Sequence, residues 1–289
     1  MLRVRSIVRS ALLPAFVATL ALGACSSDDA PNESSSVATD PTTLPDPTEA
    51  PTTTVAPVEP LRILVTNDDG YSSEGIDVLV EALRGLPEVE ITVVAPAENQ
   101  SGRGDSTTEG ELTITEGTTA SGYAATAVGG TPADSVNHAL DVVFADNPPD
   151  LVVSGSNEGQ NLGIITDVSG TVGAARTAAR RGIPALAISQ GIAAAPDFEV
   201  GVAAAIDWIV THRDDIAAFE GATAEVWSIN APTCAVGEIK GLIEIATAAA
   251  SIGSEVGTDT DCSVQLAQPA NDVEAFNAGW ITLSNVGLD

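Results

Sequence analysis

The sequence predicts an α/β protein built on a doubly wound, mostly parallel sheet with helices on both faces, a Rossmann-like arrangement. Short apolar runs alternate with segments of helical periodicity along residues 61–230. This alternation favours parallel strand pairing, with each helix crossing over one face of the sheet. Two further apolar runs, 111–115 and 123–128, are close enough in sequence to pair as a β-hairpin insertion.

The individual elements follow from local patterns. Buried strands are predicted at the short apolar runs 61–66, 90–95, 150–155, 183–189 and 224–230. The first helix is predicted because four apolar residues recur at i, i+3, i+4 and i+7 and share one face: Ile76, Leu79, Val80 and Leu83. Helices are also predicted at 170–182 and 198–219. Another begins near Thr131, which suits an N-cap, while Pro132 and Asp134 suit the first turn.

Residues 1–24 have the pattern of a bacterial lipoprotein signal peptide. Three arginines precede an apolar stretch, 11–22, that is too short to span a membrane as a helix. The sequence Leu-Gly-Ala-Cys then resembles a lipobox, which predicts lipid attachment at Cys25. An ordinary secretory signal that leaves Cys25 as a free thiol is the alternative.

Residues 25–60 predict a disordered tether between this lipid anchor and a folded domain, 61–289. The segment is rich in Ser, Thr, Pro, Asp and Glu and has almost no large apolar residue. Such a segment cannot bury enough apolar surface to offset the entropy lost on ordering. We therefore expect an exported protein, held by its N-terminal lipid at the outer face of the bacterial cell membrane.

The cysteine count agrees with export. The chain has three cysteines, and lipidation of Cys25 leaves Cys234 and Cys262 as a pair. In an oxidising compartment this pair is expected to form one disulfide, and two unpaired core thiols are the alternative.

The net charge excludes one class of partner. The 40 acidic and 11 basic residues give a net charge of −29. Without the three leader arginines and the seven acids of the tether, the domain 61–289 holds 33 acids and 8 bases, a net charge of −25. Such a surface repels a phosphate backbone, so we expect no binding to a nucleic-acid polymer. A small phosphorylated substrate stays compatible, because a metal ion can supply local positive charge.

Polar residues gather where the predicted strands end. Asp68 and Asp69 follow the first strand, Ser101 follows the second, and Asn157 follows 150–155. Ligands bind at the carboxyl ends of strands in such sheets, and adjacent carboxylates repel unless a cation joins them. Two carboxylates, a hydroxyl and an amide oxygen suit Mg²⁺, Mn²⁺ or Ca²⁺. Taken alone, the Asp-Asp-Gly stretch is also compatible with a simple turn and helix cap.

A second feature points to phosphate. The stretch Ser169-Gly170-Thr171 opens the predicted helix 170–182. The first N–H groups of a helix have no partner within it, and the helix dipole is positive at that end, so the stretch predicts a phosphate cradle.

Together these motifs resemble those of the SurE survival-protein family. The resemblance runs in order from residue 61 to about 190 and continues more weakly towards the C-terminus. Its motifs are TNDDG (66–70), NQSG (99–102), GTPAD (130–134), DLVVSGSNEGQNLG (150–163), SGTVGAA (169–175), WSINAP (227–232) and AGWITLS (278–284).

The resemblance implies an activity and a set of site residues. Members of the family are metal-dependent 5′/3′-nucleotidases, also described as acid phosphatases, so the expected reaction is hydrolysis of nucleoside monophosphates by a metal-activated water. The implied ligands of the cation, Mg²⁺ or Mn²⁺, are Asp68, Asp69, Ser101 and Asn157. The residues implied in catalysis are Asp68, Asp69 and Asn67. Those implied in substrate binding are Asn161, Ser169, Gly170 and Thr171. A homodimer is one assembly that the resemblance allows.

The chain departs from the family pattern at residues 164–168. Paired acids and an aromatic residue are usual there, whereas this chain has Ile-Ile-Thr-Asp-Val. The departure keeps a second function open, a ligand-binding lipoprotein that retains the fold without turnover. A haloacid-dehalogenase-type phosphatase is not expected, because the Asp-x-Asp spacing of its nucleophile is absent.

Overall fold

The computed structural model describes residues 59–250 and 260–288. Every described residue belongs to one compact unit of the chain. The predicted signal peptide, Cys25 and almost all of the predicted tether lie outside the described residues. Within the described residues, no helix is both long and apolar enough to cross a membrane.

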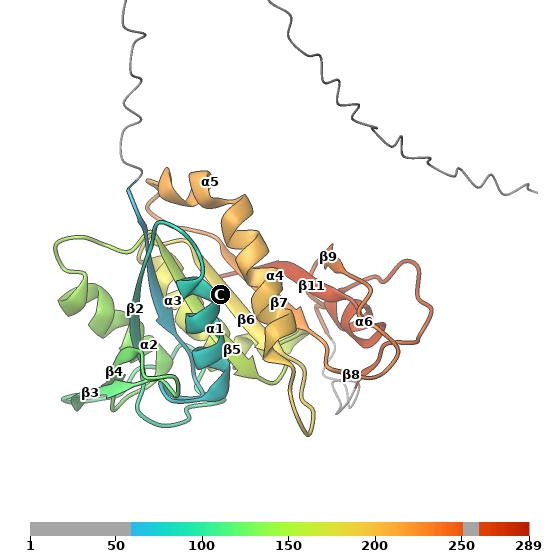
Figure 1. Ribbon diagram of the computed structural model, residues 1–289, viewed down its shortest axis with the longest axis horizontal. Coiled ribbons are helices and arrows are strands. Elements are labelled where there is room, and N and C mark those ends of the chain that lie inside the picture. Colours follow the sequence, from blue (N-terminus) through green and yellow to red (C-terminus); the bar gives the residue numbers. More distant parts are fainter. Residues whose placement is uncertain (1–58, 251–259, 289) are drawn as a thin grey trace, which may run out of the picture. The chain divides into compact units, whose positions relative to one another are not determined.

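Nine strands of the described chain form one sheet, in the spatial order β3-β4-β2-β1-β5-β6-β7-β11-β9 (Figure 1). Their bounds are β1 Leu61–Thr66, β2 Val89–Pro96, β3 Ile114–Thr118, β4 Ala124–Val128, β5 Leu151–Glu158, β6 Ala185–Gln190, β7 Val226–Ala231, β9 Leu242–Glu244 and β11 Ile281–Val286. Strands from β4 to β7 pair in parallel, whereas β3 is antiparallel to β4 and β11 is antiparallel to β7. The predicted fold class is therefore confirmed. Strands β8 (Cys234–Val236) and β10 (Thr260–Asp261) form a separate two-stranded sheet.

Helices cover both faces of the sheet. Their bounds are α1 Glu74–Arg84, α2 Pro132–His138, α3 Gly170–Arg180, α4 Phe198–Thr211, α5 Arg213–Ala217 and α6 Asp272–Asn277, with a π-helix at Ala139–Val143 and a 3₁₀ helix at Gly163–Asp167. Side chains alternate between the two faces of a strand. Ile63 and Val65 of β1 accordingly join a core with α1 and α4, while Leu64 joins a second core with α2 and α3. Burial on both faces explains why β1 is an almost unbroken apolar run.

Two predicted helix features are confirmed, the N-cap at Thr131 and the apolar face of the first helix. The side-chain oxygen of Thr131 accepts a hydrogen bond from the Asp134 backbone N–H at 3.2 Å, and the Asp134 carboxylate accepts one from the Thr131 N–H at 2.8 Å. This reciprocal pair is a capping box, and Pro132 at the first helical position has no N–H to leave unpaired. The apolar face predicted for the first helix is buried in α1: Ile76, Leu79, Val80 and Leu83.

Some boundaries differ from the prediction. The predicted helix 198–219 is interrupted at His212, whose backbone angles of −102° and 12° leave the α-helical region, so that α4 and α5 are separate. His212 Nδ1 lies 2.8 Å from the Trp208 carbonyl oxygen, and the two rings stack. The hairpin strand predicted at 111–115 begins only at Ile114, the first residue that pairs with β4. Strand β5 continues to Glu158 and so includes Asn157.

Candidate active site

The turn after β1 is held by Asn67. Its Nδ2 donates to the Gly70 carbonyl and to Ser73 Oγ, both at 2.9 Å, and its Oδ1 accepts from the Gly70 N–H at 3.1 Å. Gly70 has a φ of +105°, a conformation that side-chain-bearing residues rarely adopt. Because the amide of Asn67 is fully buried and engaged in this turn, the structure gives it a positioning role. Its predicted part in catalysis stays a prediction.

Asp68 is a buried carboxylate placed against the start of α3. Thr171 Oγ1 donates to Asp68 Oδ1 at 2.6 Å, and the Asp68 side chain is 3% exposed. A β-carbon added at Gly170 would lie only 2.7 Å from Asp68 Cβ, so glycine is needed for this close approach. Burial raises the pKa of Asp68 to about 6, with the Thr171 hydrogen bond acting to lower it and the Asp69 charge acting to raise it.

Asp69 is held from two sides. Its Oδ1 accepts from Asn99 Nδ2 and its Oδ2 accepts from the Glu158 backbone N–H, both at 2.9 Å. Burial raises its pKa, the Glu158 N–H acts in the opposite direction, and the Glu158 carboxylate adds to the rise. Asp69 therefore bridges the segment after β2 and the end of β5.

The segment after β2 carries Ser101 to the acid pair. The Gln100 N–H donates to the Asp68 carbonyl at 2.7 Å, and the Ser101 N–H donates to Asn99 Oδ1 at 3.0 Å. Asn99 in turn binds Asp69, so backbone and side chain both fix this segment. Ser101 itself is exposed at the same edge of the sheet as the two carboxylates.

Asn157 completes the predicted ligand set at that edge. It lies near the end of β5, the sheet neighbour of β1, and is 7% exposed. Its Nδ2 donates to the Gly159 carbonyl, an orientation that leaves the amide oxygen available to a ligand. The next residue, Glu158, supplies the N–H that binds Asp69. The structure thus brings Asp68, Asp69, Ser101 and Asn157 together at one end of β1, β2 and β5.

The residues predicted to bind phosphate are linked to one another. Asn161 Nδ2 donates to Ser189 Oγ at 2.9 Å and to Thr171 Oγ1 at 3.4 Å. Ser169 is the N-cap of α3, and its Oγ accepts from the Val172 N–H at 3.1 Å. These side chains therefore build and orient the site. The first turn of α3 is the part that presents a helix N-terminus beside Asp68.

The sequence analysis assigned no role to four residues that hold the site: Asn99, Ser189, Asn230 and Asp272. Asn230 Oδ1 accepts from the Asn161 N–H at 2.7 Å, and Asp272 accepts from the N–H groups of Gly163 and Ala248, both at 2.8 Å. Three of the four, Asn99, Ser189 and Asn230, lie at or just beyond the carboxyl ends of β2, β6 and β7, a position that would have pointed to a role at the site. Asp272 lies on α6 and carries no such signal.

The departure at 164–168 forms an ordered 3₁₀ turn. The buried guanidinium of Arg176 donates to the Thr166 carbonyl at 3.1 Å and lies 3.3 Å from the Asp167 carboxylate. Gly163, at the other end of the turn, is held by Asp272. The changed sequence is therefore compatible with a fixed loop next to α3.

The donor set fits a hard divalent cation. Of the ion pairs formed between described residues, none includes Asp68 or Asp69, so neither carboxylate is neutralised by a cationic side chain of the described chain. No group of three His, Cys, Asp or Glu side chains suited to a metal occurs in the described ranges. The cation would therefore depend on two carboxylates and on neutral hydroxyl and amide oxygens, a set that Mg²⁺ and Mn²⁺ accept.

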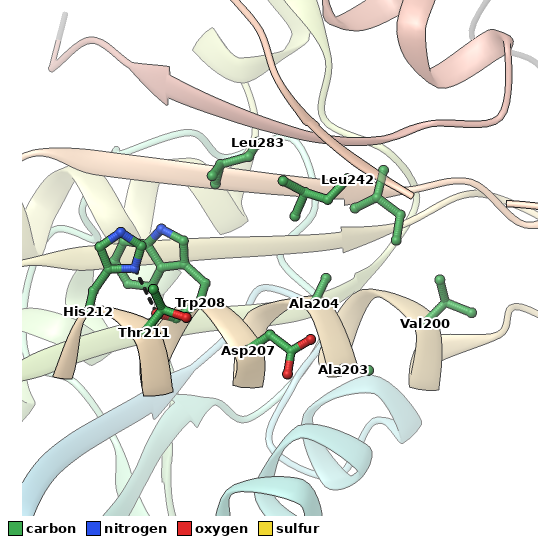
Figure 2. A pocket seen from close by; sticks show the side chains of 10 residues that line it. Val200, Ala203, Ala204, Asp207, Trp208, Thr211, His212, Leu242 and Leu283 are labelled. Atoms are coloured by element: carbon green, nitrogen blue, oxygen red, sulfur yellow. Dashed lines mark hydrogen bonds between the residues drawn. The ribbon is translucent and has the colours of Figure 1, made fainter. Parts of the chain in front are cut away.

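Two other features lie away from this site. Cys234 and Cys262 form a disulfide with a Cα–Cα distance of 5.6 Å. An apolar groove of about 550 Å³ lies beside α4, where Leu242 and Leu283 face Val200, Ala204 and Trp208 (Figure 2). None of the predicted site residues lines this groove.

The fold and the site define a class, the doubly wound α/β proteins with an acidic, oxygen-rich ligand site at the carboxyl edge of the sheet. Residues 63–253 match the family model described as Survival protein SurE, and the chain belongs to that family.

Individual relatives agree with this assignment. The chain is 35% identical over 243 residues to 5′-nucleotidase SurE of Rhizorhabdus wittichii, an alignment covering 79% of this chain and 94% of the relative. It is 45% identical over 153 residues to 5′-nucleotidase SurE of Methanocella arvoryzae, covering 53% of this chain and spanning 57% of the relative's length. The crystal structure of the SurE protein from Aquifex aeolicus superposes with a TM-score of 0.61 at 29% identity, covering 79% of this chain and 94% of the other.

Proposed function

We propose that this protein is a metal-dependent phosphomonoesterase that hydrolyses nucleoside 5′- and 3′-monophosphates. The observation that carries the proposal is the adjacent pair of Asp68, which is buried, and Asp69, which is partly buried, fixed beside the first turn of α3 without a cationic side chain among the described residues. The relatives from Rhizorhabdus and Methanocella are both named 5′-nucleotidases. These names favour an enzyme over a ligand-binding protein without turnover.

Four side chains would hold the cation: Asp68, Asp69, Ser101 and Asn157. When bound, Mg²⁺ or Mn²⁺ offsets the charge of the acid pair, polarises a phosphoryl oxygen and lowers the pKa of a water molecule. In the reaction a water oxygen bonds to phosphorus, the ester P–O bond breaks, and the products are inorganic phosphate and a nucleoside.

The protein contributes orientation and charge. Thr171 and Asn99 keep the two carboxylates in place through direct hydrogen bonds. The first turn of α3, capped by Ser169, directs backbone N–H groups and the positive end of the helix dipole towards the phosphoryl oxygens. Asn161 donates a hydrogen bond to the Thr171 hydroxyl and is itself held by hydrogen bonds with Ser189 and Asn230.

We further propose that the enzyme is exported and anchored by lipid on Cys25 at the outer face of the cell membrane. The basic, apolar and lipobox segments of residues 1–25 support this, as does the disulfide, which belongs to oxidising compartments. Labelling of cells with a radioactive fatty acid, with a Cys25→Ala variant as control, tests the anchor. Sedimentation of the purified protein tests whether it assembles as a homodimer.

Phosphate release tests the proposed activity. Purified protein is assayed with 5′- and 3′-mononucleotides in Mn²⁺, in Mg²⁺ and in chelator. We expect release that requires metal and that Asp69→Asn eliminates. Asp141→Asn is the matched control, because Asp141 is exposed on the π-helix Ala139–Val143 and pairs with Arg181 rather than with a residue of the site. A folded, metal-loaded protein that releases no phosphate from any mononucleotide would refute the proposed function.

A further inference from the structure

Almost all basic side chains of the domain 61–289 form ion pairs or hydrogen bonds within the domain. Five of its eight basic residues form ion pairs: Arg62, Arg84, Arg176, Arg180 and Arg181. Arg213 and Lys240 donate to backbone carbonyls. Only Arg103 has neither an ion pair nor a side-chain hydrogen bond with another described residue. In a domain of net charge −25, an exposed and unengaged guanidinium is unexpected.

Arg103 lies on the segment after β2, which contacts both the acid pair and the residues just before α3. Two residues before it is Ser101, a proposed metal ligand, and one residue after it the Gly104 N–H donates to the Val168 carbonyl at 3.1 Å. Val168 immediately precedes Ser169, the N-cap of α3. The Arg103 backbone therefore lies at the rim of the site, between the metal ligands and the first turn of α3.

The backbone of Arg103 is fixed although its side chain is unengaged. Its N–H donates to the Gln100 carbonyl at 3.3 Å, and its carbonyl accepts from Ser106 N at 3.2 Å and from Ser106 Oγ at 2.6 Å. A fixed backbone limits the region that the guanidinium can reach, which lowers the entropy lost when it binds a ligand.

Two acids close to Arg103 in the structure form ion pairs with other arginines. Asp105, two residues further on, pairs with Arg180 at 2.7 Å. Asp167, on the turn before α3, pairs with Arg176 at 3.3 Å. Both pairings remove nearby carboxylates that could otherwise have engaged Arg103.

We propose that Arg103 binds the non-bridging oxygens of the substrate's phosphoryl group at the rim of this site, an inference that rests on the proposed function. A guanidinium can donate two parallel hydrogen bonds to phosphate, and such charge-assisted pairs are stronger than neutral ones. The divalent cation only offsets the two carboxylates, so a dianionic phosphate needs additional positive charge. Arg103 supplies that charge and thereby favours phosphomonoesters over uncharged nucleosides.

The test compares Arg103→Gln with Arg84→Gln in the full-length, metal-loaded protein. Arg84 is exposed and is the last residue of α1. It lies about 15 Å along the helix axis from the start of α1, which is the end nearer the site. Arg84→Gln therefore changes the net charge by the same amount as Arg103→Gln but away from the site. Three quantities are measured: KM for a nucleoside monophosphate, the inhibition constant of inorganic phosphate, and the inhibition constant of the nucleoside. Arg103→Lys is measured in parallel.

We expect Arg103→Gln to raise KM and the phosphate inhibition constant about 10- to 100-fold, the usual effect of losing a hydrogen bond to a charged group. Nucleoside inhibition should stay within twofold of wild type, Arg84→Gln should match wild type, and Arg103→Lys should recover part of the loss. Equal losses in the two glutamine variants, equal weakening of nucleoside and phosphate, or no change in Arg103→Gln would each overturn the proposal.

Failure of the proposed function is distinguishable from failure of this inference. If wild type releases no phosphate, the proposed function is refuted. The binding of inorganic phosphate to metal-loaded protein, measured by calorimetry, still decides whether Arg103 binds phosphate. Weaker phosphate binding in Arg103→Gln but not in Arg84→Gln supports the proposal, and equal binding in all three proteins overturns it.

Discussion

At the scale of single residues, the hydroxyl of Thr171 links α3 to the acid pair. It donates to Asp68 at 2.6 Å from a fully buried position. Thr171→Val keeps the shape of the side chain and removes the donor, so Asp68 loses both its orientation and a stabilising hydrogen bond. We expect the dissociation constant of Mn²⁺ to rise about tenfold or more, since a hydrogen bond to a charged group contributes roughly 1.5–3 kcal/mol.

Calorimetric titration with Mn²⁺ checks this prediction. Thr177→Val is the control, because Thr177 lies on the same helix and its hydroxyl donates only to the Gly173 carbonyl. Equal metal affinities for the two variants would show that the Thr171–Asp68 contact does not support the cation.

Asp68 also predicts how the stability of the chelated, metal-free protein depends on pH. Burial raises its folded-state pKa to about 6 from an ordinary value of 3.8. A carboxyl with a raised pKa stabilises the fold while protonated, and this contribution is lost as pH rises from about 4 through 6. Asp68→Asn removes the titrating group. We expect the metal-free wild type to lose about 2–2.5 kcal/mol more than Asp68→Asn between pH 4 and pH 7.5.

Urea unfolding of both metal-free proteins at the two pH values measures this difference. Adding Mn²⁺ at pH 7.5 should stabilise wild type and have little effect on Asp68→Asn. Parallel pH profiles for the two chelated proteins would contradict the prediction.

At the scale of elements, the strands of the sheet could be predicted from the sequence, whereas the long-range hydrogen bonds that hold the site could not. Strand ends could be predicted because burial on both faces leaves uninterrupted apolar runs, and polar residues then follow each run. The pairing of Gly163 with Asp272 joins residues 109 positions apart, and no local pattern records such a contact. The amide of Asn67 could be placed at the site from its position, but its hydrogen-bonding partners required coordinates.

The approach of the 101–104 segment to α3 depends on a glycine. A β-carbon at Gly173 would lie 2.2 Å from the Gly104 carbonyl oxygen. Gly173→Ala improves helix propensity by about 1 kcal/mol, yet the clash involves backbone that cannot move without shifting Ser101. We therefore expect a lower free energy of unfolding and weaker Mn²⁺ binding.

Thermal unfolding and Mn²⁺ titration of Gly173→Ala measure both effects. Gly287→Ala is the matched control, because a β-carbon there meets nothing within 4 Å. If Gly173→Ala were as stable as wild type and bound Mn²⁺ equally well, the close packing of this segment on α3 would not determine the position of Ser101.

At the scale of the whole molecule, the C-terminal segments reinforce a site built mainly from the N-terminal half. Phe276 and Val273 of α6 pack with Ala248 and with Leu162, the neighbour of Asn161. Asp272 ties Ala248 to Gly163 by hydrogen bonds. The disulfide closes the chain around this region, since Ala248 lies between its two cysteines.

The disulfide should therefore contribute substantially to stability. It spans 28 positions, and a loop of this length is expected to contribute about 3–4 kcal/mol by restricting the unfolded chain. We expect the double variant Cys234→Ala and Cys262→Ala to lose that free energy of unfolding in urea. Reduction with dithiothreitol should lower the free energy of unfolding of wild type to a similar value and leave that of the variant unchanged. If the variant unfolds at the same urea concentration as oxidised wild type, the disulfide does not restrict the unfolded chain.

The same variant should also bind Mn²⁺ more weakly, because Ala248, between the two cysteines, and Leu162, beside the site, share one apolar cluster.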